Sequence, residues 1–255
     1  MNQSFQLSHK VAVVTGGNGG IGLGMARGLG LAGAAVAIAG RDRAKSAAAV
    51  EALAEDGIRA HAVEVDVADA DSCVAMVAEV ENVLGRLDIC VCNAGINNRK
   101  PPETYTPEEW RQIQAVNLDG VFFTAQAAYP ALMRQGGGKV ITIGSMTSLF
   151  GIGVVAAYGA SKGGVMQLTR ALACAWAKDR IQVNCILPGW IDTDLTRRGR
   201  VEIEGLHEKV MDRTPAGRWG TPEDLAGLAV FLAGGASDFV TGTAIPVDGG
   251  YSAQG

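Results

Sequence analysis

The chain has 255 residues, enough for one large domain with a substantial core, and 48% of them are apolar. Its net charge of −4 argues against nucleic acid or an anionic membrane surface as the main partner. The longest apolar run, residues 28–40, is too short and too rich in glycine to span a bilayer, and residues 1–10 contain no apolar signal core.

The cysteines indicate a reducing compartment. They are five, an odd number, and fall mostly within predicted strands and helices. We therefore expect a cytoplasmic protein in which all five are buried as small hydrophobic residues, with neither a disulfide nor a metal site. They are Cys73, Cys90, Cys92, Cys174 and Cys185.

Short runs rich in Val and Ile alternate along the chain with longer stretches rich in Ala and Leu. This alternation predicts right-handed crossovers and a single Rossmann-like α/β domain over residues 1–255, with a doubly wound parallel sheet of seven strands. The strands lack polar/apolar alternation, as expected when helices cover both faces of the sheet. Strands are predicted at 10–15, 34–39, 60–65, 88–93, 139–144, 181–187 and 244–247, and helices at 20–32, 43–56, 69–84, 107–135, 156–179 and 222–233.

The first strand runs into a glycine-rich loop, Thr15-Gly-Gly-Asn-Gly-Gly-Ile-Gly22, that opens the first helix. Glycines let the backbone turn sharply and approach a pyrophosphate, which then lies at a helix N-terminus. The spacing G-x-x-x-G-x-G differs from the commoner G-x-G-x-x-G, but the mechanics are the same. We expect this loop to bind a dinucleotide through Gly16, Asn18, Gly20, Ile21 and Gly22.

The choice between NAD and NADP is expected at the end of the second strand, residues 39–42. A carboxylate there would bind the ribose 2′-hydroxyl and repel a 2′-phosphate. The strand instead ends at Gly40, and Arg41 follows, a residue suited to pair with a phosphate. Asp42 is close enough to bind a ribose, but we expect it to begin the next helix. NADP is therefore favoured over NAD.

Later strand ends supply further cofactor contacts. Asp66 and Val67 follow the third strand and are expected at the edge of the adenine ring. Asn93-Ala94-Gly95 follows the fourth strand and is expected to close the floor of the cofactor groove.

Two helix starts carry capping signals. Thr106, with proline after it and Glu109 at the third helical position, predicts a capping box, and Thr221 with Asp224 repeats the arrangement.

Tyr158 and Lys162 lie four residues apart, hence on one face of a helix and one turn apart. A fixed ammonium beside a phenol favours the phenolate, so a tyrosine that ordinarily titrates near about 10 becomes a usable proton donor and acceptor near neutrality. Ser145, on the loop after the fifth strand, adds a hydroxyl expected in the same place. Together with the glycine loop, these residues predict a dehydrogenase.

At this point the chain resembles the short-chain dehydrogenase/reductase family, in its branch of about 250 residues. The matching elements span nearly the whole chain in the family order. They are residues 15–22, Asp66-Val67, Asn93-Ala94-Gly95, Asn117, Ser145, Tyr158 with Lys162, Pro188-Gly189 with Thr193, and residues 247–250.

The resemblance implies a role for each of these residues. Tyr158 would act as general acid and base, Ser145 would hydrogen-bond the substrate carbonyl, and Lys162 would lower the pKa of Tyr158 and bind the nicotinamide ribose. Asn117 would hold a water that relays protons to Lys162. The nicotinamide carboxamide would be held by Pro188, Gly189, Ile191 and Thr193.

Residues 190–219, beyond the sixth strand, are expected to form a substrate lid. Four stretches, at 93–99, 145–146, 213–220 and 236–242, resemble those of sugar-acid dehydrogenases of the gluconate 5-dehydrogenase and 2-deoxy-D-gluconate 3-dehydrogenase types. Arg99 is then expected to bind a substrate carboxylate, with Met146 and Trp190 as walls and Arg197 or Arg198 as further anionic contacts.

The sequence is also compatible with other substrate classes and functions. A wall of Met146, Leu149, Phe150 and Trp190 equally suits an apolar ketone or a 3-oxoacyl thioester, for which the basic run 197–200 offers a carrier-docking patch. A non-catalytic, cofactor-sensing regulator is a further alternative, although such a protein is expected to have lost Tyr158 or Lys162. An epimerase or dehydratase is disfavoured for lack of a second substrate domain. The family implies a homotetramer, which apolar surface on the helices 107–135 and 156–179 supports.

Overall fold

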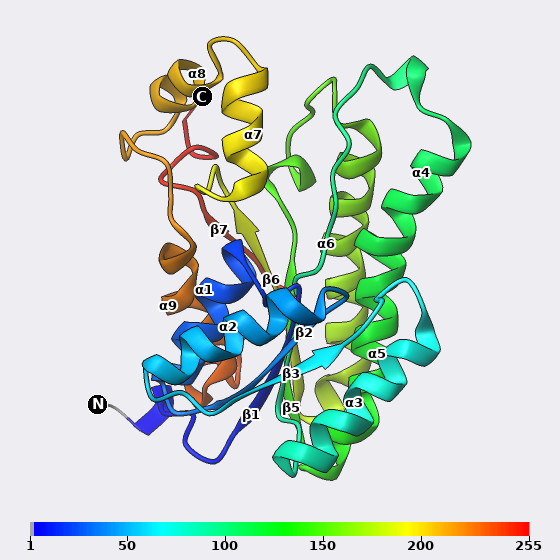
Figure 1. Ribbon diagram of the computed structural model, residues 1–255, viewed down its shortest axis with the longest axis vertical. Helices are drawn as coiled ribbons and strands as arrows, with labels where there is room; N and C mark the ends of the chain where they lie inside the picture. The colour runs from blue at the N-terminus through cyan, green and yellow to red at the C-terminus, as the bar shows by residue number, and fades with distance from the viewer. Residues whose placement is uncertain (1–2, 255) are drawn as a thin grey trace.

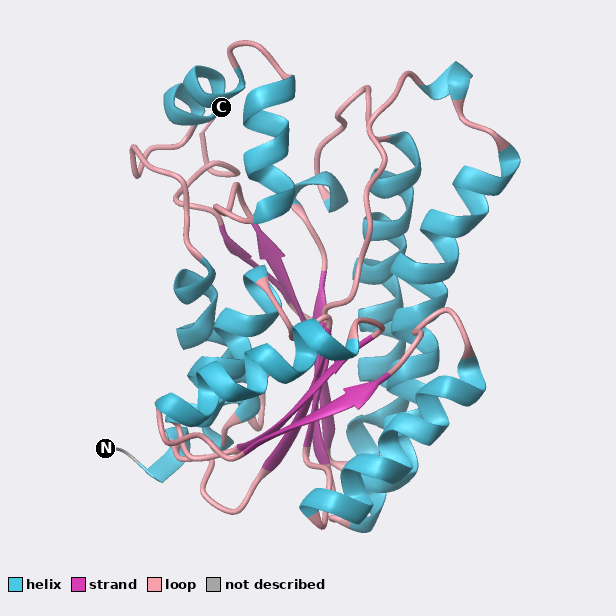
Figure 2. Ribbon diagram, viewed as in Figure 1, coloured by secondary structure: helices cyan, strands magenta, loops and turns pink. Residues whose placement is uncertain are grey.

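A computed structural model describes residues 3–254, apart from the side chains of Gln3, Leu195, Arg198 and Glu202. It contains a parallel sheet of seven strands in the order β3-β2-β1-β4-β5-β6-β7 (Figures 1 and 2). The predicted doubly wound sheet is therefore confirmed, with each strand within two residues of its expected bounds. The strands are β1 Val11–Thr15, β2 Ala35–Gly40, β3 Ala60–Glu64, β4 Ile89–Cys92, β5 Gly138–Ile143, β6 Ile181–Pro188 and β7 Ala244–Val247.

Helices cover both faces of the sheet, and the side chains of β1 show why its sequence is apolar throughout. Val11 and Val13 enter the core on one face, and Ala12 and Val14 enter the core on the other. The first core is closed by α3 Ala70–Leu84, α5 Gly120–Arg134 and α6 Ala156–Trp176, with α4 Pro107–Gln114 continuing that layer. The second is closed by α1 Gly20–Leu31, α2 Arg43–Glu55 and α9 Ala226–Ala233.

The helix predicted over 107–135 is interrupted. Thr106 forms the expected capping box with Glu109, and α4 then ends at Gln114. A π-helical segment, Ala115–Asp119, precedes α5 and contains the buried Asn117. Short π-helical segments inside α-helices occur frequently at functional sites. The helix predicted over 222–233 likewise begins as a 3₁₀ turn, Pro222–Leu225.

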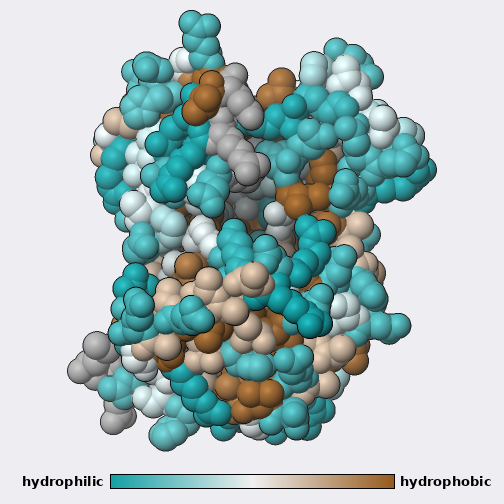
Figure 3. Space-filling view, in the orientation of Figure 1, coloured by the Kyte–Doolittle hydropathy of each residue, from teal (hydrophilic) through white to brown (hydrophobic). Residues whose placement is uncertain are grey.

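Residues 190–219 contain two helices, α7 Asp194–Glu202 and α8 Leu206–Arg213. They stand beyond the carboxyl ends of β6 and β7, close to the C-terminus (Figure 1). Leu206, Val210 and Trp219 form a small core of their own beneath these helices. The surface is hollowed between this projection and the one that carries the start of α4 (Figure 3).

Four of the five cysteines are buried, as predicted, but the prediction is wrong for Cys174. Its neighbours Leu172 and Ala173 face the core, and the rotation of about 100° per helical residue turns Cys174 to the exposed side of α6. Within residues 3–254, no helix is long and apolar enough to cross a membrane.

Candidate active site

The glycine loop opens onto a cavity of about 430 Å³ at the carboxyl ends of β1 and β4. These strands are where the strand order reverses, the usual ligand position in an open α/β sheet. Gly16 has φ of +62°, and a Cβ on Gly22 would lie 2.2 Å from the Gly16 carbonyl oxygen, so both positions require glycine. No described side chain caps α1, which leaves its first N–H groups free for an anion. The loop therefore fits the pyrophosphate of a dinucleotide.

The floor of this cavity is held by Asn93, as the sequence predicts. The Asn93 side-chain amide donates to the carbonyl oxygens of Thr15 and Gly16 at 3.0 and 3.1 Å. The Thr15 hydroxyl accepts from the backbone N–H of Asn93 at 3.0 Å. These bonds tie the loop after β4 to the glycine loop and bring Ala94 and Gly95 into the cavity lining.

At the end of β2, Asn18 lies over the backbone of Gly40. A Cβ on Gly40 would lie 2.8 Å from the Asn18 amide nitrogen, which itself donates to Ser46 Oγ at 3.0 Å. A side chain at residue 40 would therefore displace the Asn18 amide from this position. Asp42 caps α2, as expected, by accepting from the Lys45 N–H at 2.9 Å.

Two cations, Arg41 and Lys45, lie exposed beside this strand end. Lys45 lines the cavity, with its ammonium 3.0 Å from the Cβ position of Gly19, and was missed in the sequence. Its placement in the first turn after the Asp42 cap was the available signal. Arg41, Asp66 and Val67 lie outside the cavity lining, and their roles stay predictions.

The other end of the cavity is built by the segment after β6. Pro188, Gly189, Ile191 and Thr193 all line it, as predicted. A Cβ on Gly189 would lie 2.6 Å from the Asp248 Cα, so this segment packs directly on the chain after β7.

Ser145, Tyr158 and Lys162 meet where this cavity adjoins a second one. Ser145 follows β5, and its Oγ accepts from the Thr147 N–H at 3.1 Å. Burial raises the pKa of Tyr158 above its usual value, while a hydrogen bond with Ser145 and the positive charge of Arg99 oppose that rise. The expectation that Lys162 brings the phenol toward neutrality is therefore wrong for this structure, because burial is the larger effect.

The Lys162 ammonium hydrogen-bonds to a backbone carbonyl oxygen of β5. This ammonium is buried, donates to the Ile143 carbonyl oxygen at 2.8 Å, and lies 5.7 Å from the centre of the Tyr158 ring. Burial lowers the pKa of Lys162 from 10.5 to about 8.

The side chain of Asn117 bridges the loop after β4 and α6. Its Oδ1 accepts from the Ile96 N–H at 2.8 Å, and its Nδ2 donates to the Ile96 carbonyl at 2.9 Å and to Ser161 Oγ at 3.1 Å. A Cβ on Gly95 would lie 3.4 Å from this Oδ1 and 3.6 Å from Lys162 Nζ. Asn117 therefore lies near Lys162, as predicted, although the water relay stays a prediction.

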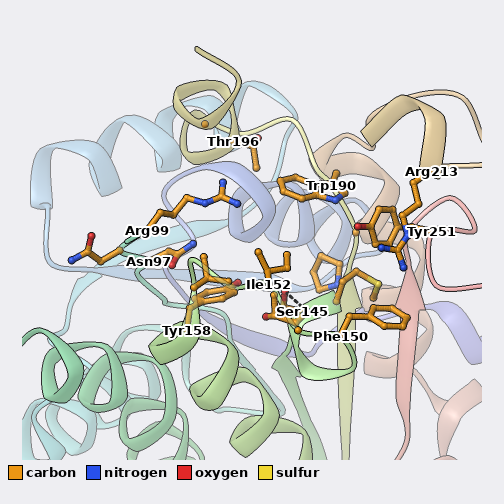
Figure 4. Close-up of a pocket in the computed structure, with 18 residues that line it drawn as sticks. Asn97, Arg99, Ser145, Phe150, Ile152, Tyr158, Trp190, Thr196, Arg213 and Tyr251 are labelled. Carbon is orange, nitrogen blue, oxygen red and sulfur yellow. Dashed lines mark hydrogen bonds between the residues drawn. The ribbon is translucent and has the colours of Figure 1, made fainter. Parts of the chain in front are cut away.

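The second cavity, about 380 Å³, lies between Tyr158 and the lid segment (Figure 4). Arg99 lines it as predicted, with its guanidinium 5.8 Å from the Trp190 ring and its Nε buried without a partner among the described residues. No Asp or Glu belongs to the described lining. The lining residues are Asn97, Asn98, Arg99, Ser145, Met146, Thr147, Phe150, Gly151, Ile152, Val155, Tyr158, Pro188, Gly189, Trp190, Thr196, Gly199, Arg213 and Tyr251.

The expectations for Leu149 and Arg197 are wrong, and two residues that line the pocket were not predicted. Leu149 is exposed and outside the lining, because the 3₁₀ turn Met146–Ser148 directs the chain outward. Arg197 is exposed and pairs with Asp192 and Asp194 rather than facing the pocket, and the side chain of Arg198 lies outside the described residues. Arg213 and Tyr251 line the pocket but were not assigned to it from the sequence, since they lie far apart along the chain and meet through packing.

Comparisons with known proteins agree with this geometry. Residues 16–252 match a family described as enoyl-(acyl carrier protein) reductase. The chain is similar to the 5-keto-D-gluconate 5-reductase of Escherichia coli K12, with 41% identity over 98% of each chain. It is also similar to the gluconate 5-dehydrogenase of Gluconobacter oxydans, with 39% identity over 97% of this chain and 96% of that one.

The solved structures include a gluconate 5-dehydrogenase from Burkholderia cenocepacia in complex with NADP and tartrate. It is 40% identical to this chain, has a TM-score of 0.94, and the similarity covers 99% of both chains.

Proposed function

The chain belongs to the short-chain dehydrogenase/reductase family of NAD(P)-dependent oxidoreductases, and we propose that it interconverts the secondary alcohol and ketone of a sugar acid. The substrate is of the keto-gluconate type. The observation that carries this proposal is the pocket beside Ser145 and Tyr158, which contains arginine but no described carboxylate. Such a pocket favours an anionic, hydroxylated substrate over a neutral ketone. The names of the similar proteins support the same class.

In the direction of reduction, bound NADPH supplies a hydride to the carbonyl carbon. Tyr158 donates its phenolic proton to the carbonyl oxygen, and its raised pKa keeps that proton in place until charge develops on the oxygen. Ser145 donates a hydrogen bond to the same oxygen. The Lys162 ammonium places a positive charge near the Tyr158 ring. In the direction of oxidation, the same proton transfers run in reverse.

Arg99 has two effects in this proposal. Its guanidinium binds the substrate carboxylate, and its charge, which already opposes the rise of the Tyr158 pKa, also stabilises the developing oxyanion. Trp190 beneath the guanidinium and Met146 shape the apolar walls. The lid segment, 190–219, covers the substrate.

We propose NADP(H) as the preferred cofactor. Arg41 and Lys45 are both exposed at the end of β2, while Asp42 is engaged as a helix cap. Two cations without a competing carboxylate suit a 2′-phosphate. The similar Burkholderia cenocepacia structure was obtained with NADP.

A homotetramer in the cytoplasm is part of the same proposal. Trp110, Phe122 and Met133 are large apolar side chains exposed along α4 and α5, which fits a helix layer covered by another subunit. Light scattering at micromolar concentration tests the oligomer, and a monomer would remove it.

The matched family description favours a second candidate, an acyl thioester reductase. The lid arginines proposed to dock a carrier already have acidic partners, because Arg197 pairs with Asp192 and Asp194, and Arg200 pairs with Asp192. This pairing makes the thioester the less favoured substrate.

The test is oxidation of NADPH and NADH, followed at the nicotinamide absorbance, with keto-sugar acids, neutral keto-sugars, simple ketones and a 3-oxoacyl thioester. We expect turnover with a keto-sugar acid and NADPH. Turnover with the thioester or apolar ketones alone would reject the sugar-acid proposal, and no turnover with any ketone would favour a cofactor-sensing regulator.

A further inference from the structure

A second guanidinium, that of Arg213, faces the substrate pocket from the end of α8. It lies 4.3 Å from the centre of the Tyr251 ring and 5.4 Å from that of Phe150. Aromatic stacking engages the faces of a guanidinium and leaves the N–H groups at its edge available. The two rings therefore orient Arg213 without using its hydrogen-bond donors.

Arg213 also lacks an anionic partner among the described residues, although it lies in the pocket lining. The chain has more acidic than basic side chains, 26 against 22, and most arginines pair with a carboxylate, as Arg134 does with Glu81. Arg213 makes no hydrogen bond or ion pair with any residue that the structure describes. Its neighbour on the same segment, Arg218, donates to Asp224 at 2.6 and 2.8 Å.

Arg99 and Arg213 lie on opposite sides of Ser145 (Figure 4). A substrate held by Ser145 and Tyr158 at its carbonyl can thus extend toward a cation in both directions. A sugar acid with one carboxylate engages one of these guanidinium groups and leaves the other facing a hydroxyl group.

We propose that Arg213 is a second anion-binding residue and that the substrate is a keto-sugar diacid, with a carboxylate at each end of the chain. The inference rests on the proposed function and deepens it. Tyr158 lies on the Arg99 side of the pocket, and the Arg99 charge acts on its phenol, so the reacting carbonyl lies nearer the carboxylate that Arg99 binds. A charge-assisted pair of this kind changes binding by roughly 10- to 100-fold.

The test compares kcat/KM with NADPH for a keto-sugar diacid and for the keto-sugar monoacid of equal chain length. The wild-type protein should prefer the diacid at least on the order of tenfold, and Arg213→Met should abolish most of that preference. Arg218→Met, which removes an arginine already paired with Asp224, should leave the ratio unchanged.

The outcomes separate the two proposals. A monoacid preferred by the wild type, or equal losses for both substrates in Arg213→Met, would overturn the diacid inference while the sugar-acid function stands. Turnover of neither acid would reject both.

A binding measurement distinguishes an anion-binding role from a structural one. In the presence of NADPH, which cannot react with it because the diacid glucarate carries no ketone, glucarate should bind Arg213→Met at least on the order of tenfold more weakly than wild type, and Arg213→Lys should retain part of the affinity. Tyr251→Leu removes one stacking ring and keeps the Arg213 charge. If it weakened glucarate binding as much as Arg213→Met does, Arg213 would act only by packing against the rings.

Discussion

The Lys162 ammonium donates a 2.8 Å hydrogen bond to the carbonyl oxygen of Ile143, the last residue of β5. This bond links the helix that carries Tyr158 to the strand end that precedes Ser145. A second bond, from Ser148 Oγ to the Lys162 carbonyl at 2.7 Å, reinforces the link. Lys162 therefore positions both Tyr158 and Ser145, in addition to carrying charge.

The charge on Lys162 predicts the alkaline limb of the activity profile. Because burial lowers its pKa to about 8, while the Tyr158 pKa is raised, Lys162 loses its proton first. We expect kcat/KM for ketone reduction to fall as pH rises through about 8. Lys162→Arg should move that limb upward, since a guanidinium stays charged. A wild-type profile that stays flat to the titration of Tyr158 would contradict this assignment.

The lowered pKa of Lys162 also predicts how the free energy of unfolding changes with pH. An unfolded lysine titrates near 10.5, so between about 8 and 10.5 the unfolded chain binds a proton that the folded protein does not. The free energy of unfolding contributed by this group should therefore rise with pH across that window. Urea unfolding of wild type and Lys162→Met at pH 7 and pH 9.5 measures it, and an equal pH dependence in both proteins would count against the shift.

Replacement of Tyr158 by Phe tests the proton donor. The ring remains while the hydroxyl is lost, so the fold and cofactor affinity should persist and kcat should fall by about 10²- to 10⁴-fold. Tyr129→Phe is the matched control, because the Tyr129 hydroxyl bonds to Asp179 at 3.0 Å, outside both cavities. Comparable turnover of Tyr158→Phe and Tyr129→Phe would show that another group donates the proton.

The features of this protein that depend on local sequence pattern could be predicted. The sheet, the glycine loop and the placement of Ser145, Tyr158 and Lys162 follow from strand ends and helical spacing, and these were predicted. The π-helical turn at Asn117 was not, because its side chain is held by Ile96 and Ser161, residues distant along the chain. The burial of individual side chains could not be predicted from the sequence either.

Burial and long-range packing account for the other differences. The pKa of Tyr158 is set mainly by loss of solvent around the ring, which spacing from Lys162 does not reveal. Arg213 enters the pocket only because Phe150 and Tyr251, from two other segments, pack against it. Cys174 faces solvent because it lies on the outer side of a long helix. The apolar composition of the helix does not show which of its residues lie on that side.

Gly22→Ala should impair cofactor binding. Its Cβ would lie 2.2 Å from the Gly16 carbonyl oxygen and 2.5 Å from Asn93 Nδ2, so the loop that receives the pyrophosphate must shift. We expect the Kd for NADPH, measured by fluorescence titration, to rise at least on the order of tenfold. In Gly227→Ala the new Cβ meets nothing within 4 Å, so affinity should not change and stability should increase by up to about 1 kcal/mol. Equal NADPH affinity in the two variants would argue against this position for the pyrophosphate.

Cofactor preference should depend on Arg41 and Lys45. Each replacement, Arg41→Ser or Lys45→Met, should lower kcat/KM with NADPH on the order of tenfold and leave kcat/KM with NADH nearly unchanged. Asp42→Asn is the control, since Asn also caps helices well and the NADPH/NADH ratio should stay constant. If the NADPH/NADH ratio of kcat/KM changed in Asp42→Asn but not in Arg41→Ser or Lys45→Met, NAD would be favoured as the native cofactor.

Asp88 should stabilise the fold without taking part in catalysis. Its buried carboxylate accepts from Arg86 at 2.7 and 2.8 Å, from Lys10 at 3.0 Å and from the Val11 N–H at 3.0 Å. Burial alone would raise its pKa, but these hydrogen bonds outweigh that effect and hold the pKa below its usual value. The stabilisation is therefore present above the unfolded pKa of about 3.9 and lost as pH falls through the folded pKa.

Asp88→Asn should reduce the free energy of unfolding by about 1.5–3 kcal/mol at pH 7, because the amide keeps the shape but loses the charge-assisted bonds. Arg86 and Lys10 are partly exposed and regain water when the charge is removed, which limits the loss. The difference from wild type, measured by urea unfolding, should shrink as pH falls below 4. Asp88 lies at the amino end of β4, opposite the cavities, so kcat/KM of the folded variant should match wild type. A pH-independent difference would mean that the carboxylate contributes by packing alone.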